Sequence, residues 1–123
     1  MTSRATITTI SSFVKNQSDE NNKRFVFSYT ITIENISDKA FQLISRHWVI
    51  QDANRKIEEI YGEGVVGEQP IIASGEKYSY SSGAVLETEM GTMQGRYFML
   101  SPNMDEFEVV IPKFVLSVPR TLH

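Results

Sequence analysis

The segment at residues 24–35 (RFVFSYTITIEN) most constrains the fold, because large apolar side chains occupy every second position in it. The intervening positions are mostly small or polar. A period of two with aromatic and β-branched residues predicts a β-strand with one buried face. The buried face would carry Phe25, Phe27, Tyr29, Ile31 and Ile33.

Other short segments show the same strand character, and Gly or Pro residues separate several of them. No window shows sustained apolar spacing at 3.6 residues, so we expect no long helix. Many short strands with frequent turn residues predict an all-β antiparallel β-sandwich, with a closed barrel as the alternative. Trp48 on about the third strand favours an immunoglobulin-like layout. The expected strands lie at residues 4–15, 40–52, 56–61, 76–83, 95–100, 106–111 and 113–118.

Two of these segments depart from simple alternation. Ile7 and Ile10 differ in parity, which predicts a bulge or bend in the first strand. Leu43 has the opposite parity to Trp48, which predicts a bulge near Leu43 or burial on both faces. Pro112 is expected to separate the last two strands.

Composition limits the classes of function. The 123 residues fit a single domain, 1–123. The net charge of −3 argues against nucleic-acid binding, which depends on clustered Lys and Arg. The absence of Cys excludes thiolate metal sites and Cys nucleophiles. The N-terminal residues lack a signal-peptide pattern and no apolar run reaches membrane-spanning length, so we expect a cytoplasmic protein without membrane contact.

Residues 62–67 contain Gly62-x-Gly64-x-x-Gly67, the spacing of a dinucleotide-binding fingerprint. That fingerprint requires a following helix whose N-terminus faces the pyrophosphate. Here Val65, Val66 and Pro70 favour strands and turns, so we interpret the glycines as turn positions. A backbone nest that binds an anion without a helix is an alternative, although Glu63 and Glu68 would repel phosphate.

Four segments carry a family resemblance: "RHWVIQDAN", "YGEGVVGEQP", "GEKYSYSSG" and "GTMQGRYFM". They closely resemble the bacterial ApaG family, also called the CorD-like family, and the similarity runs from about Ile7 to the C-terminus. Where that family often has Gly after "QDAN", this chain has Arg55, so Asn54 is expected to take any left-handed position. Ser74-Gly75 replaces the family's frequent Pro-Gly.

The resemblance implies a sandwich of the fibronectin type III kind. It also implies a link to cobalt and magnesium resistance or efflux, and a glycine stretch that has been likened to a pyrophosphate-binding motif. Related domains in larger eukaryotic proteins look like protein-binding modules. The family supplies no established catalytic residues.

Other candidate sites are weak. His47 should lie on the opposite strand face from Trp48 and be solvated, and His123 is terminal, so neither predicts a transition-metal site. Glu87 and Glu89 share one strand face and would bind Mg²⁺ or Co²⁺ weakly if they converged with the glycine loop; a solvated acidic edge is the preferred interpretation. No residue set for nucleophilic or acid–base catalysis is recognisable.

The sequence therefore predicts a non-enzymatic protein-interaction module without a cofactor or bound metal, whose partner protein is unidentified. Weak binding of pyrophosphate, a nucleotide or a divalent cation at the same loop is the alternative. A weak homodimer through strand edges stays open. The expected recognition residues are Gly62, Glu63, Gly64, Gly67, Glu68, Gln69 and Arg46.

Overall fold

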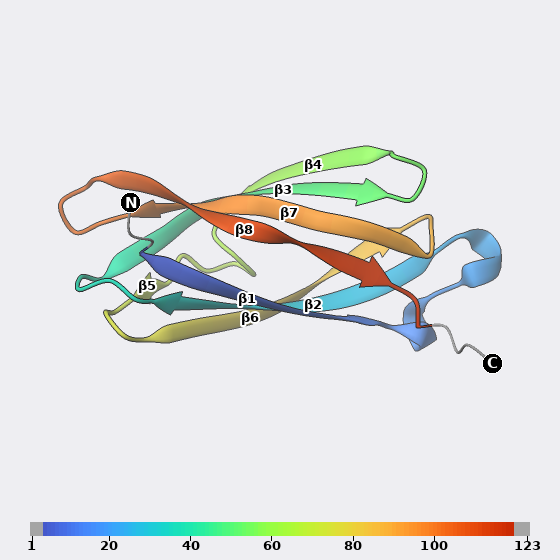
Figure 1. Ribbon diagram of the computed structural model, residues 1–123, viewed down its shortest axis with the longest axis horizontal. Helices are drawn as coiled ribbons and strands as arrows, with labels where there is room; N and C mark the ends of the chain where they lie inside the picture. Colours follow the sequence, from blue (N-terminus) through green and yellow to red (C-terminus); the bar gives the residue numbers. More distant parts are fainter. Residues whose placement is uncertain (1–3, 120–123) are drawn as a thin grey trace.

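The computed structural model describes residues 4–119 and shows two antiparallel β-sheets packed face to face (Figure 1). One sheet has the order β1-β2-β6; the other has the order β4-β3-β7-β8, with β5 paired to the beginning of β3. The sandwich prediction is confirmed, and the barrel alternative is wrong. The strands are β1 Ala5–Phe13, β2 Phe25–Asn35, β3 Phe41–Asp52, β4 Ile57–Glu63, β5 Ile71–Ile72, β6 Lys77–Leu86, β7 Met90–Leu100 and β8 Glu106–Ser117.

Helical structure in residues 4–119 is limited to two single-turn 3₁₀ segments between β1 and β2, Lys15–Gln17 and Glu20–Asn22. No helix in this part of the chain has the length and apolar character needed to cross a membrane.

The core forms where the alternating face of β2 meets the second sheet. All five apolar residues predicted for that face are buried. Trp48 of β3 lies at the centre, and its ring centroid is 5.5 Å from that of Tyr29 and 6.0 Å from that of Phe114. The buried Trp on the third strand thus has the packing role expected in an immunoglobulin-like sandwich.

Two register shifts bend the larger sheet. The first lies between Leu43 and Ser45, as the parity change in β3 predicted. The second lies between Met93 and Gly95 of β7, opposite the part of β8 that contains Pro112. The predicted break at Pro112 is wrong, because an edge strand at a register shift tolerates a residue without an N–H donor.

The bulge predicted in β1 is also wrong. Its register with β2 is continuous from Ala5 opposite Asn35 to Phe13 opposite Phe27. Ile10 simply faces solvent and is 67% exposed. A single exposed apolar side chain is ordinary and leaves the strand geometry undisturbed.

Gly95 provides a direct test of how closely β7 approaches β3. A Cβ at this position would lie 2.0 Å from the carbonyl oxygen of His47. Gly95→Ala should lower the free energy of unfolding by about 3 kcal/mol, because backbone must move to relieve the clash. The matched change Gly83→Ala, whose Cβ would lie 3.3 Å from the Phe27 carbonyl oxygen, should stay within about 1 kcal/mol of the parent. Urea denaturation measures both, and equal losses would contradict the geometry.

Tyr80 and Tyr97 form a buried hydroxyl pair between the sheets. Burial is the main cause that raises the pKa of each phenol above its usual value of 10.0. The unfolded chain therefore ionises these groups near pH 10 while the folded protein keeps their protons.

Stability should consequently be retained below pH 10 and fall above it, by about 1.4 kcal/mol per pH unit for each buried tyrosine. Urea denaturation at successive alkaline pH values measures this slope. Replacing both tyrosines with Phe removes the hydroxyls together, so neither is left unpaired, and the slope should decrease. An unchanged slope would show that other groups control alkaline unfolding.

Candidate functional site

The glycine loop, defined as residues 62–69, leaves the end of β4 and leads through Pro70 into β5. It lies on the side of the sandwich opposite β1 and β8, which we call the open side, and it contacts β3 of the larger sheet and β6 of the smaller one. No helix begins in it or after it in the described chain. The turn interpretation is confirmed, and the helix that a dinucleotide site requires is absent from residues 4–119.

The tip of the loop is a two-residue hairpin. Val65 N–H donates to the Glu68 carbonyl at 2.8 Å, and Glu68 N–H donates back at 2.9 Å. Between them Val66 and Gly67 have φ values of 44° and 82°, as in a type I′ turn. Val65 is buried, whereas Val66 points outward and is 56% exposed. Neither valine lies within a strand: Val65 forms an isolated bridge with Glu68, and Val66 holds a turn conformation unfavourable for a β-branched residue.

Each glycine of the motif answers a different steric need. A Cβ on Gly62 would lie 2.6 Å from Nη1 of Arg46, and one on Gly64 would lie 2.1 Å from the Glu68 carbonyl oxygen. Gly64 also has a φ of 61°. At Gly67 a Cβ would meet no atom within 4 Å, so only its positive φ favours glycine.

Arg46 of β3 holds the loop through its backbone. Its Nη1 donates to the Gly64 carbonyl at 2.8 Å and to the Glu63 carbonyl at 3.1 Å. Side chains from the loop bind other strands: Gln69 Nε2 donates to the Ile44 carbonyl at 2.9 Å, and Tyr78 of β6 donates to Glu68. The structure therefore brings all seven predicted residues into one connected unit.

Several polar groups of the loop that could contact an anion are already bonded within the chain. The N–H groups of Gly64, Val65 and Glu68 are already bonded to carbonyl oxygens of the chain. The guanidinium of Arg46 likewise faces carbonyl oxygens within the loop. The carboxylates of Glu63 and Glu68 are on exposed residues and add negative charge. This arrangement favours contact with a cation or an apolar group over contact with phosphate.

Exposed apolar side chains accompany the loop along the same side of β3. Tyr61 lies opposite His47 in the ladder, and Ile71 lies opposite Gln42. Both Tyr61 and Ile71 are 69% exposed. Sequence analysis missed them as surface residues, because their alternation resembles that of core strands and the face they occupy depends on the register. We call Tyr61, Val66 and Ile71 the apolar edge.

His47 was predicted to be solvated, and this prediction is wrong. It is 7% exposed and stacks on Tyr61 with ring centroids 4.1 Å apart. Its Nε2 lies 3.1 Å from a carboxylate oxygen of Glu59. His47 does face away from Trp48, but the neighbouring strand β4 covers it. His123 lies outside the described residues.

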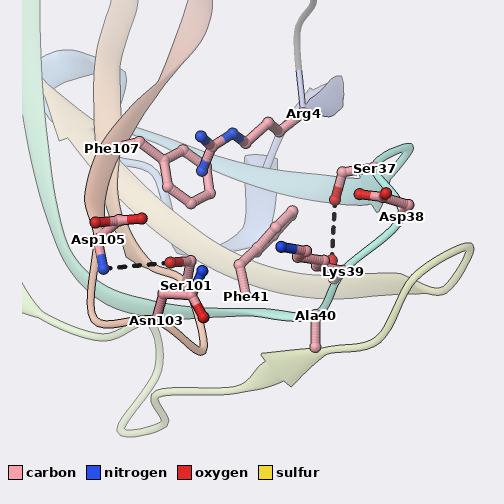
Figure 2. A pocket seen from close by; sticks show the side chains of 10 residues that line it. All are labelled: Arg4, Ser37, Asp38, Lys39, Ala40, Phe41, Ser101, Asn103, Asp105 and Phe107. Carbon is pink, nitrogen blue, oxygen red and sulfur yellow. Dashed lines mark hydrogen bonds between the residues drawn. The ribbon is translucent and has the colours of Figure 1, made fainter.

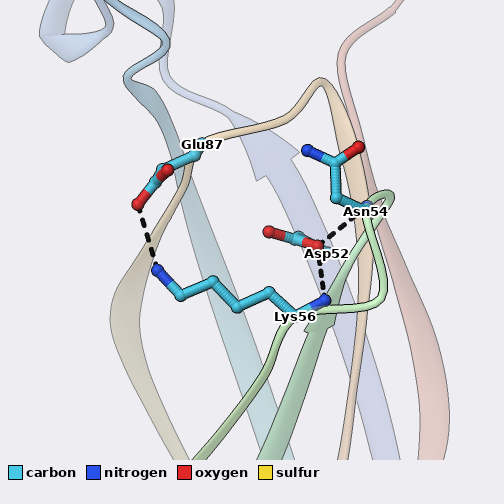
Figure 3. Close-up of polar contacts among 4 residues, drawn as sticks. All are labelled: Asp52, Asn54, Lys56 and Glu87. Carbon is cyan, nitrogen blue, oxygen red and sulfur yellow. Dashed lines mark hydrogen bonds and ion pairs between the residues drawn. The ribbon is translucent and has the colours of Figure 1, made fainter.

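The acidic residues do not converge as the cation alternative requires. Glu87 pairs with Lys56 at 3.1 Å beside the turn before β4, as Figure 3 shows, so the length of β4 separates it from the glycine loop. The hydrogen bond to Glu87 is the main cause that raises the pKa of Lys56. Within residues 4–119, no three His, Asp or Glu side chains form a group that could hold a metal ion.

The turn in Figure 3 also corrects a backbone expectation. Asp52 accepts hydrogen bonds from the N–H groups of Asn54 and Lys56, at 2.8 and 2.9 Å. Arg55, not Asn54, takes the left-handed conformation, with φ 67°. The Asp52 side chain holds the turn on both sides of Arg55, which accounts for the position of the left-handed residue.

A separate hollow of about 250 Å³ lies at one end of the sandwich. Arg4 covers the ring of Phe107 with its guanidinium carbon 4.2 Å from the centroid, and Phe41 meets the same ring edge-on (Figure 2). Hydrogen bonds from Ser37 to the Lys39 carbonyl and from Asp105 N–H to Ser101 stay within the adjoining turns. These contacts cap the core, and the charges lining the hollow are of both signs.

Comparison with known proteins identifies the chain. The family model described as ApaG domain matches residues 15–101. The chain belongs to the ApaG domain family. It is 53% identical to Protein ApaG from Thiobacillus denitrificans over 90% of this chain and 87% of that protein. Identity to Protein ApaG from Aromatoleum aromaticum is 50%, covering 98% and 94%.

A solved ApaG-like structure supports the fold in detail. A Bordetella pertussis protein described as ApaA superimposes with a TM-score of 0.92 at 43% identity, covering 95% of both chains. The C-terminal domain of wzt matches with a TM-score of 0.58 at 10% identity, which shows the fold alone. The ApaG resemblance read from the sequence is thus confirmed.

The different roles of the glycines in this ApaG domain can be separated by mutation. Gly64→Ala should lower the free energy of unfolding by about 3 kcal/mol or more, because both its φ and the Glu68 carbonyl oppose a side chain. Gly67→Ala should cost only about 1–2 kcal/mol, since it meets the conformational penalty alone. Urea denaturation measures the difference. Equal costs would mean that the loop relaxes away from the observed geometry.

Proposed function

We propose that this ApaG domain is a non-catalytic protein-interaction module that recognises its partner with the apolar edge and the acidic side chains beside it. The observation that carries the proposal is the loop tip, where an exposed valine is held in a left-handed conformation. Strained, exposed residues are commonly retained at sites of recognition. Exposed apolar groups in a polar surround are typical of interfaces.

The chemistry of the described residues supports a binding role over a catalytic one. The two groups with the largest pKa shifts, Tyr80 and Tyr97, are buried and bond to each other, so they do not face a cleft. His47 is covered by Tyr61 and bonded to Glu59. The bond from His47 Nε2 joins it to a carboxylate and not to a Ser or Thr hydroxyl that it could activate.

The small-ligand alternative receives less support from the loop. The N–H groups of Gly64, Val65 and Glu68 are bonded within the protein, and the exposed charges of the loop are carboxylates. The link to cobalt and magnesium that the family resemblance implies would then be indirect. In this proposal a bound partner protein, and not a metal site in this chain, would connect the domain to metal handling.

The proposal predicts that Val66→Asn separates stability from recognition. Asn before Gly67 suits a type I′ turn, so the free energy of unfolding should rise by about 1 kcal/mol. Partner binding should weaken, because the exposed apolar tip is lost. Urea denaturation and partner binding are measured on the same variant. A variant that is more stable and binds the partner normally would contradict this role of Val66.

The partner required for that measurement can be obtained by photo-crosslinking in cells. A photoreactive phenylalanine analogue replaces Val66 or, as a control, the exposed Val115 of β8. A specific adduct formed from position 66 but not from position 115 supports the proposal.

Titration with pyrophosphate, Mg²⁺ and Co²⁺ tests the alternative. Saturable changes in the NMR chemical shifts of the amides, confined to the three loop glycines, would favour a small ligand.

A further inference from the structure

The backbone of β4 offers hydrogen-bonding groups on its outer side. β4 is the last strand of its sheet, with β3 as its partner within the described chain (Figure 1). Gly64 N–H donates to Ile44 C=O at 2.8 Å, and Asp52 N–H donates to Lys56 C=O at 3.0 Å. In an antiparallel ladder these bonds recur at alternate residues, so the even-numbered residues of β4 face β3. The odd-numbered residues therefore point their N–H and C=O groups away from the sheet. The carbonyl of Glu63 is bonded to Arg46, which leaves Ile57, Glu59 and Tyr61.

The same three residues present a defined side-chain pattern. Ile57 and Tyr61 are 60% and 69% exposed, and Glu59 lies between them on one face. Glu58 and Glu63 add two further carboxylates, and β4 contains no basic side chain. Two apolar anchors with an acidic centre therefore lie beside free backbone donors and acceptors.

The other strand edges lack this combination. β1 and β8 lie against each other, with Ser11 Oγ donating to the Val115 carbonyl at 2.9 Å. β8 also contains Pro112, which blocks regular pairing. Beside the open edge of β6, Ser79 and Ser81 bond to threonines of β2 and offer no apolar anchor.

We propose that β4 accepts an extended basic segment of a partner protein as an additional antiparallel strand. A Lys or Arg of that segment lies opposite Glu59, and apolar residues flank it opposite Ile57 and Tyr61. This inference rests on the interaction function proposed above and specifies the partner's chemistry. A second copy of this chain is a poor occupant, because pairing two β4 strands would bring the three carboxylates of each strand close together and they would repel.

A synthetic peptide as long as β4, seven residues, tests the inference on the full chain. The probe has the sequence Thr-Val-Thr-Arg-Thr-Val-Thr, in which threonine alternates with the valines and the arginine. Binding should slow hydrogen exchange of the Ile57, Glu59 and Tyr61 amides roughly tenfold or more, because each gains a carbonyl partner. N-methylation of the valines and arginine should abolish binding, whereas N-methylation of the threonines should not, since only the former donate to β4.

Reversing the charge of Glu59 provides an independent test of peptide binding. Glu59→Lys should weaken binding of the arginine peptide roughly tenfold and favour a peptide with glutamate in place of arginine. The control Glu106→Lys makes the same charge change at the start of β8 and should leave binding unchanged. Equal effects of both N-methylation patterns, or no protection of the three amides, would overturn the inference. Protection that appears without peptide and tracks a dimeric mass would assign β4 to a second copy instead.

The outcomes also separate this inference from the function on which it rests. A partner crosslinked through Val66 whose binding is insensitive to Glu59→Lys, together with no peptide binding, leaves the interaction function standing and removes strand addition. Absence of any specific adduct from Val66, together with no peptide binding, removes both.

Discussion

Arg46 makes the interaction on which the open side of the sandwich depends. After β4 the chain passes through the glycine loop before β5 pairs again with the beginning of β3, so the carbonyls of Glu63 and Gly64 lie outside the regular ladder and need new donors. A guanidinium presents several N–H groups in one plane and can serve both. Gly62 leaves the space in which this group lies. A phosphate cradle binds an anion through backbone amides, whereas this loop binds a cation of its own chain through backbone carbonyls. The glycine spacing is shared, but the polarity is reversed.

Only the local features of this arrangement could be predicted from the sequence. Strand character is local, so the alternation in β2 and the parity change at Leu43 identify their elements directly. The absence of a helix after Gly67 follows from the β-branched residues and Pro70. The roles of the glycines were not accessible in this way, because the group that excludes a side chain at Gly62 comes from another strand. The burial of His47 has the same origin: Tyr61 covers it only when the register of β3 and β4 is known.

Val66 shows how strain and exposure are combined at the loop tip. Val65 fills the core beside it, so the hairpin has one buried anchor and one outward residue. A Gly or Asn at the outward position would relieve the backbone without disturbing that anchor. Packing within the chain therefore gives no reason for an exposed β-branched residue there. The partner contact proposed above would supply one, and this distinguishes Val66 from the exposed apolar residues that lie on regular strands.

The acidic character of β4 is consistent with the proposed selection of a partner. An exposed strand with apolar side chains would pair with many extended chains, including other copies of itself, because backbone hydrogen bonding does not depend on sequence. Carboxylates at Glu58, Glu59 and Glu63 make self-pairing unfavourable while leaving the outward N–H and C=O groups accessible. The same charge would favour the basic strand proposed above. Protection of the edge and choice of partner would then be two consequences of one arrangement of charge, and neither requires a pocket or a catalytic group.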